Sequence, residues 1–208
     1  MKLDWRGEIT SVQPRFRLLR SFNERHHNYL GFALRVLGTI DGEDREAWVG
    51  VGPAAHEKHH FEVGQRVRGR AQPVADPRAD TADYYKVAGM VVEAGAGSST
   101  SDFPPWHGVA PAIEVYRARG HRRLAARTWA STACSSCIWG ARMPVEMIVD
   151  HWNPDQKRYR FETFCYGPKS CGLYRPGPTR KVPGRRGMTY EEEDRVDEEE
   201  TAHRGADE

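Results

Sequence analysis

The chain has 208 residues, of which 38% are hydrophobic and 29% charged, and a formal net charge of +2. No stretch approaches the ~20 consecutive apolar residues of a membrane-spanning helix, which argues against membrane insertion. Met1–Arg6 lacks the apolar run of a secretory signal. We therefore expect a cytoplasmic location, no membrane partner and reduced cysteines.

The charge is distributed unevenly along the chain. From Glu191 to Glu208 there are ten Asp and Glu against two Arg, a net charge of −8, so residues 1–190 carry +10. A basic body favours an anionic partner, and an acidic tail could compete for the same surface or dock a protein. Acidic segments are also commonly disordered, and we expect disorder for residues 188–208.

Residues 1–95 are predicted to form short β-strands separated by Gly, Pro and Asp. Alternation is clearest in Tyr29–Ile40, where Leu30, Phe32, Leu34, Val36 and Ile40 define one apolar face. The pattern predicts strands at Trp5–Leu19, Tyr29–Ile40, Glu46–Val51, Arg66–Ala71 and Tyr84–Glu93, with a short helix at Pro53–His60.

This order of three strands, a short helix and two strands resembles the OB-fold, and Phe61–Gly69 looks like the helix-to-strand entry of many OB domains. The resemblance covers a little under half the chain; an SH3-like barrel is the alternative. It implies a five-stranded barrel that holds single-stranded nucleic acid on strands two and three and on nearby loops. Alternation predicts that Tyr29, Arg35 and Trp48 share the outward face, and the loops would be 20–28 and 72–83. On the fourth strand, the residues expected to face outward are Arg66, Arg68 and Arg70.

Residues 96–110 begin with a Gly- and Ser-rich run and are predicted to form a flexible linker. Beyond them, Pro111–Arg119 is expected to be another strand. Two β-rich runs follow, Val145–Trp152 and Lys157–Phe164, and Asn153–Gln156 between them is a turn signal.

The chain contains four cysteines, spaced C-x2-C, then 27 residues, then C-x5-C: Cys134, Cys137, Cys165 and Cys171. Two close pairs separated by a hairpin resemble a zinc ribbon, and the wide second pair leaves a treble-clef-like arrangement open. Four thiolates fill the tetrahedral shell of one structural Zn²⁺. Disulfides or a redox pair are the alternative, and His121 or His151 could replace Cys171.

A basic stretch with interleaved aromatic residues overlaps this module. Cations bind phosphates and aromatic rings stack on bases, so the stretch is a candidate nucleic-acid interface, with Arg175–Gly187 as an extended arm. Its candidate residues are Lys157, Arg158, Arg160, Lys169, Arg175, Arg180, Lys181, Arg185 and Arg186.

His56-Glu57-Lys58-His59-His60 matches the H-E-x-x-H pattern of zinc metalloproteases. Such a site needs two histidines one turn apart on a longer helix and a third ligand. The short predicted helix favours a polar surface segment instead.

The sequence thus predicts a mainly β protein with four parts: an OB-like barrel (1–95), a linker (96–110), a zinc-ribbon-like module with a basic arm (111–187) and an acidic tail (188–208). The expected function is non-catalytic binding of single-stranded or structured DNA or RNA, with low sequence specificity and one structural zinc. A protein-docking adaptor in a larger nucleic-acid complex and a zinc metallohydrolase using His56, Glu57 and His60 are the alternatives.

Overall fold

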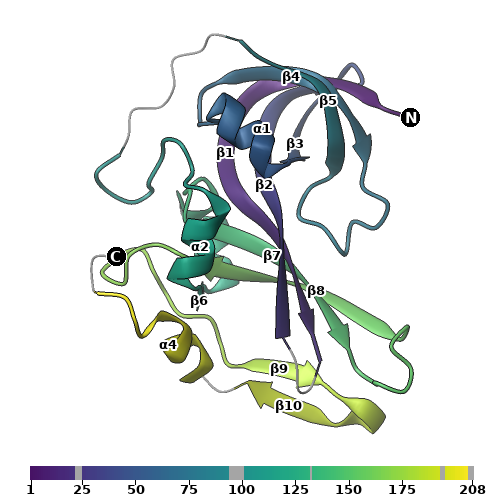
Figure 1. Cartoon of the computed structure of the whole chain (residues 1–208), viewed down its shortest axis with the longest axis vertical. Coiled ribbons are helices and arrows are strands. Elements are labelled where there is room, and N and C mark those ends of the chain that lie inside the picture. The colour runs from purple at the N-terminus through teal and green to yellow at the C-terminus, as the bar shows by residue number, and fades with distance from the viewer. Residues whose placement is uncertain (22–24, 94–100, 132, 193–194, 206–208) are drawn as a thin grey trace.

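A computed structural model describes residues 1–21, 25–93, 101–131, 133–192 and 195–205. The protein is mainly β, as the sequence predicts (Figure 1). The strands of the first half are β1 (Leu3–Arg20), β2 (Arg25–Ile40), β3 (Glu43–Val51), β4 (Arg66–Pro73) and β5 (Tyr84–Glu93), and α1 (Pro53–His59) lies between β3 and β4. All six elements were predicted, with errors of a few residues at their ends.

These five strands form a ring-like sheet. β1 pairs with β2, β2 with β3, β3 with β5 and β5 with β4, and β4 returns to pair with β1. Most apolar positions of the strands face the interior, where Ile9, Val12, Leu34 and Val49 are completely buried, while Leu37 and Val91 are exposed. Alternation within each strand therefore explains the core of the ring.

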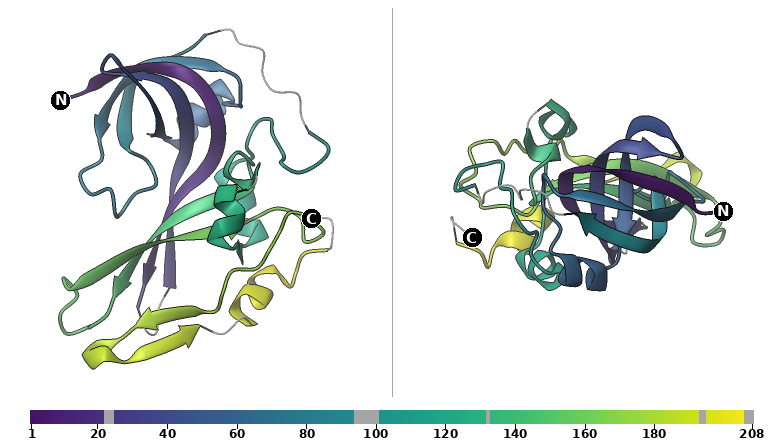
Figure 2. Two further views of the ribbon diagram at one scale, coloured as in Figure 1. Left: turned by 180° about the vertical axis from the view of Figure 1, so that it is seen from behind. Right: turned by 90° about the horizontal axis from the view of Figure 1, so that it is seen from above.

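β1 and β2 are longer than the ring requires and continue into the second half of the molecule (Figures 1 and 2). There, Leu18–Arg20 of β1 pairs in parallel with Val145–Met147 of β7 (Gly140–Ile148). β7 pairs with β8 (Lys157–Cys165), and β8 with the short β6 (Arg122–Arg123). One eight-stranded sheet thus runs through both halves.

The strand predicted at Pro111–Arg119 is wrong: Ile113–Arg119 forms helix α2. Ile113 and Tyr116, three residues apart, are buried, while Val115 is exposed. This is the spacing of one helix face rather than of a strand. Short helices α3 (Ala126–Ser131) and η1 (Ala133–Ser135) follow and lead to the cysteines.

The C-terminal segment was predicted to be disordered, and this is wrong for its described residues. β9 (Arg180–Pro183) pairs with β10 (Thr189–Glu192), joined through η2 (Arg185–Gly187), and α4 (Arg195–Thr201) follows. Arg204 is buried and donates to the carbonyls of Tyr166 and Gly167. The acidic net charge of this segment predicts that it is solvated, but it cannot predict the β9–β10 pairing or the hydrogen bonds of Arg204.

The predicted linker lies partly outside the described residues. In its described part, Trp106 packs against the core and Ala110 is buried within it. The Trp106 carbonyl also accepts a hydrogen bond from the Ile138 backbone. Trp106 and Ala110 therefore pack against the body of the protein, whereas Phe103 is exposed.

Candidate nucleic-acid interface and cysteine cluster

The four cysteines come from two separate parts of the chain and line one small cavity together with Trp106. Cys134 lies in η1, Cys137 in the turn after it, Cys165 at the end of β8 and Cys171 in the loop beyond. The fold therefore brings to one cavity the four cysteines that the C-x2-C and C-x5-C spacing identified. Cys137, Cys165 and Cys171 form no disulfides.

Burial raises the pKa of the Cys137 thiol to about 12, while backbone N–H groups of Trp139 and Trp106 donate to its sulfur and lower that pKa. Burial likewise raises the pKa of Cys165, against a hydrogen bond from the Gly167 backbone. In both cases a donor lies two residues after the cysteine. Such N–H groups favour a thiolate, but burial outweighs them at both residues, so the neutral thiols are favoured until a metal ion replaces their protons.

Gln13 ties the cysteine turn to the ring. Its side chain is buried on β1 and its Nε2 donates to the carbonyls of Cys134 and Cys137, at 3.0 and 3.1 Å. Gly140 allows this close approach, because a Cβ there would lie 2.2 Å from the Cys134 carbonyl oxygen. Sequence reasoning missed Gln13, since its partners are more than 120 residues away.

Among the described residues, no three His, Cys, Asp or Glu side chains come together at metal-binding separation. The two histidines considered as substitutes do not line the cysteine cavity. His121 is buried with its Nδ1 3.1 Å from Glu200 Oε2, and His151 lies in the turn between β7 and β8. The described residues include the four cysteines, so their sulfurs, as placed, do not form a ready metal site, and neither histidine completes one.

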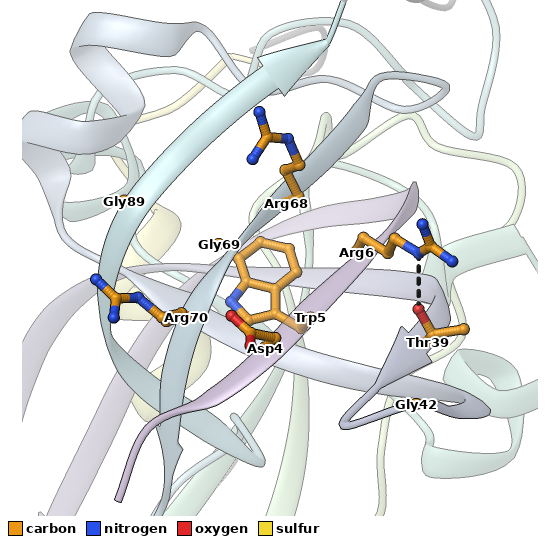
Figure 3. A pocket seen from close by; sticks show the side chains of 9 residues that line it. All are labelled: Asp4, Trp5, Arg6, Thr39, Gly42, Arg68, Gly69, Arg70 and Gly89. Carbon is orange, nitrogen blue, oxygen red and sulfur yellow. Dashed lines mark hydrogen bonds between the residues drawn. The ribbon is translucent and has the colours of Figure 1, made fainter.

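A groove on the outside of the ring collects the predicted arginines of β4. One part, of about 570 Å³, is lined by Arg68, Arg70, Arg6 and Asp4 (Figure 3). A second part, of about 460 Å³, shares Arg6 and is lined by Arg66 as well. The four arginine side chains are exposed, and so are the carboxylates of Asp4, Glu8 and Glu93 that also line the groove. The groove therefore presents a row of four cations beside three anions.

The strand register places Arg6 directly opposite Arg68, the centre of this row. Arg6 donates to Thr39 and Arg68 pairs with Glu93 at 3.1 Å on the exposed surface. Like charges at opposed positions are unfavourable unless something neutralises them. Arg6 was missed by sequence reasoning, because its place beside Arg68 depends on the pairing of β1 with β4.

The flanking arginines, Arg66 and Arg70, stand opposite Glu8 and Asp4. Neither forms an ion pair within the part of the chain that the structure describes. Their guanidinium groups are therefore available to an external anion.

The predicted outward trio is only partly assembled. Arg35 and Trp48 are opposite each other on β2 and β3, with the guanidinium 5.8 Å from the indole ring centre. Tyr29 does not join them, because β2 bulges between Tyr29 and Gly31 and Tyr29 pairs with Phe16, a core residue. The bulge turns Tyr29 to the inner face, which corrects the prediction from simple alternation.

Most cations of the predicted basic stretch have partners within the protein. Lys157 pairs with Glu146, Lys181 with Glu191 and Arg185 with Asp150. The side chains of Lys169 and Arg175 donate to backbone carbonyls. Among the described residues of the stretch, Arg158 and Arg186 are exposed and form no such contact.

Glu162 on β8 forms ion pairs with three arginines close to the segment that was predicted to be an extended arm. Its carboxylate lies 2.5 Å from Arg160, 3.0 Å from Arg180 and 3.8 Å from Arg20. Burial raises the pKa of Glu162, but the three arginines outweigh it and hold that pKa below 4.5. With β9 and its partner β10 in place, Arg175–Gly187 is not an extended arm, which corrects that expectation.

The H-E-x-x-H segment does not assemble a metal site. His56 is buried and its Nε2 lies 2.8 Å from the carbonyl of Ala110. His60 lies beyond the end of α1, in a left-handed conformation, and is exposed. The two rings therefore face different environments, and burial lowers the pKa of His56.

Comparison with known proteins assigns no family or function, because no protein family, curated protein or solved structure matches the chain. None of the helices in the described residues is long and apolar enough to cross a membrane.

Proposed function

We propose that this protein is a non-catalytic nucleic-acid-binding protein whose ring of strands is an OB-like barrel. The closed order β1-β2-β3-β5-β4, with a short helix between β3 and β4, supports this interpretation. The partner is DNA or RNA, bound through its backbone with low sequence specificity.

The observation that carries the proposal is the row of four exposed arginines along the groove. Arg66, Arg68 and Arg70 occupy alternate positions of one strand, so their Cα atoms are ~6.6 Å apart. This spacing suits consecutive phosphates of an extended strand. A phosphate beside Arg6 and Arg68 would give Arg6 an anionic partner, whereas Arg68 already pairs with Glu93.

A single Zn²⁺ held by Cys134, Cys137, Cys165 and Cys171 completes the proposal. The shared cavity and the backbone N–H groups near two of the sulfurs support it. Binding requires the thiols to lose their protons and turn toward the cavity. Four protein ligands leave no open position, so the metal has a structural role.

Fluorescence anisotropy with labelled single strands of DNA and RNA, measured over a range of salt concentrations, tests the proposal. The logarithm of the association constant should fall linearly with the logarithm of salt concentration. Replacing Arg68 with alanine should reduce this slope by about 0.7 if the side chain contacts one phosphate of a single strand.

Arg127→Ala is the matched control, because Arg127 is an exposed arginine on α3, outside the groove. It should leave the slope unchanged. A wild-type protein that binds neither DNA nor RNA at low salt would overturn the proposed function. If wild type and Arg68→Ala bind with equal salt slopes, the protein binds nucleic acid at a surface other than the groove.

A further inference from the structure

The turn between β7 and β8 presents a tryptophan almost completely to solvent. Trp152 is 83% exposed, more than any other tryptophan among the described residues. Exposing an indole ring to water is unfavourable. A large aromatic side chain in such a position is typical of a binding surface.

The turn holds Trp152 in place through a series of short hydrogen bonds. The Asp150 carboxylate accepts from the Trp152 backbone N–H at 3.0 Å, and the Asp150 carbonyl accepts from Asn153 at 3.1 Å. The Gln156 backbone then donates to Asn153, also at 3.1 Å. This is an Asx turn followed by a second turn. The backbone beneath the indole is therefore preorganised.

A second hairpin tip lies beside this turn. Arg185, in the connection from β9 to β10, places its Nε 3.6 Å from Asp150. This ion pair balances the carboxylate that forms the Asx turn. Arg186 follows in a left-handed conformation, with φ of 56°, and is exposed.

Arg158 adds a further exposed cation near the start of β8, opposite Met147 of β7. Neither Arg158 nor Arg186 forms an ion pair in the described part of the chain. Arg186 is next to Arg185, which contacts the same Asp150 carboxylate that accepts from the Trp152 backbone. Single-stranded nucleic acid binds where an aromatic ring stacks on a base and nearby cations contact phosphates.

We propose that Trp152 is a base-stacking residue for single-stranded nucleic acid and that Arg158 and Arg186 contact the flanking phosphates. This inference rests on the proposed function and adds a second contact. That contact lies at the turn between β7 and β8, far from the paired part of β1 and β4 that carries the groove (Figure 1). The turn also carries Asp150, which is paired with Arg185, and the exposed Asp155. The stacking surface together with Arg158 and Arg186 favours nucleic acid over a protein partner.

Anisotropy measurements with an unmodified single strand and with an abasic strand of equal length test the stacking directly. Trp152→Ala should weaken binding of the unmodified strand roughly 5- to 150-fold. Trp152→Phe should retain part of the affinity, while Trp152→Leu should behave like the alanine variant. On the abasic strand, wild type and Trp152→Ala should bind equally.

The salt dependence separates stacking from charge. Trp152→Ala should keep the wild-type slope, whereas Arg158→Ala should reduce it by about 0.7. Phe103→Ala is the matched control, because Phe103 is 77% exposed and lies before α2 in a different segment. It should bind like wild type.

Three results would overturn the inference. Wild-type affinity of Trp152→Ala for the unmodified strand would remove Trp152 from the interface while leaving the proposed function intact. Full affinity of Trp152→Leu would show an apolar contact rather than stacking. Failure of wild type to bind any single strand would remove both proposals. Because Trp152 is exposed, circular dichroism should show unchanged folding in every variant.

Discussion

Replacing Asp80 with alanine should destabilise the protein strongly, because it isolates a buried arginine. Arg15 of β1 donates to Asp80 from Nε at 2.8 Å and from Nη2 at 2.5 Å. The side chains are only 10% and 6% exposed. The Asp80 carboxylate also accepts from the Ala82 backbone. This pair fastens the loop between β4 and β5, one of the predicted binding loops, to the ring.

The expected cost follows from the burial of both partners. Removing one member of a buried ion pair typically costs about 3–5 kcal/mol, because the remaining charge stays desolvated. For a chain of this size, that corresponds to a fall of about 6–20 °C in the melting temperature. Arg15 cannot easily turn to solvent, since its guanidinium packs on Gly50 and a Cβ there would lie 2.7 Å away.

Urea denaturation followed by tryptophan fluorescence measures the effect. Asp76→Ala is the control within the same loop: Asp76 pairs with Arg78 at 2.9 Å, but on the surface. Exposed pairs contribute little to stability, so this variant should unfold like wild type. If Asp80→Ala and Asp76→Ala have the same unfolding free energy, the buried pair does not fasten the loop.

Two further predictions concern Glu162 and the metal. Because the native pKa of Glu162 lies below 4.5, the native state binds fewer protons than the unfolded state under acidic conditions, so the unfolding free energy should fall as the pH drops below 4.5. Glu162→Gln should lower stability at neutral pH and flatten this acid dependence in urea titrations; an unchanged pH profile would contradict the assignment. Protein purified without added metal should contain one zinc per chain by mass spectrometry, Cys165→Ser should lose it and His56→Ala should retain it. Two zinc ions per chain, one of them lost in His56→Ala, would restore the hydrolase alternative.

The strands of the ring could be predicted because their residues alternate. Tyr84–Glu93 was predicted with the observed bounds, and the predicted starts or ends of the other strands differ by a few residues. The segment at Ile113–Arg119 failed, since Ile113, Val115 and Tyr116 fit a strand and a helix almost equally well over seven residues. The buried contacts of Tyr116 decide the outcome.

Pairings between distant residues could not be predicted from local pattern. The contact of Leu18–Arg20 with β7 spans more than 120 residues, and it joins two segments that the sequence separates by a linker. The hydrogen bonds from Arg204 to the carbonyls of Tyr166 and Gly167 likewise could not be predicted from composition. Both depend on tertiary structure that no short window contains.

The candidate site residues also fall into two groups, those that local sequence spacing identifies and those that depend on strand pairing. The cysteine spacing alone identified the residues that line one cavity. Counting charges along the basic stretch could not show that its acidic residue, Glu162, pairs with Arg160 and Arg180. Arg6 was missed, since only the register of β1 with β4 brings it opposite Arg68. Tyr29 was misplaced by a bulge that alternation does not reveal.

Ultraviolet crosslinking of a photoreactive single strand, followed by peptide mapping with mass spectrometry, tests the central claim most directly. We predict crosslinks in the peptides that contain Arg6 and Arg66–Arg70, and these crosslinks should fade at high salt. Crosslinks confined to other surfaces, or none at low salt where the wild-type protein is folded, would contradict the assignment of the groove as a nucleic-acid interface.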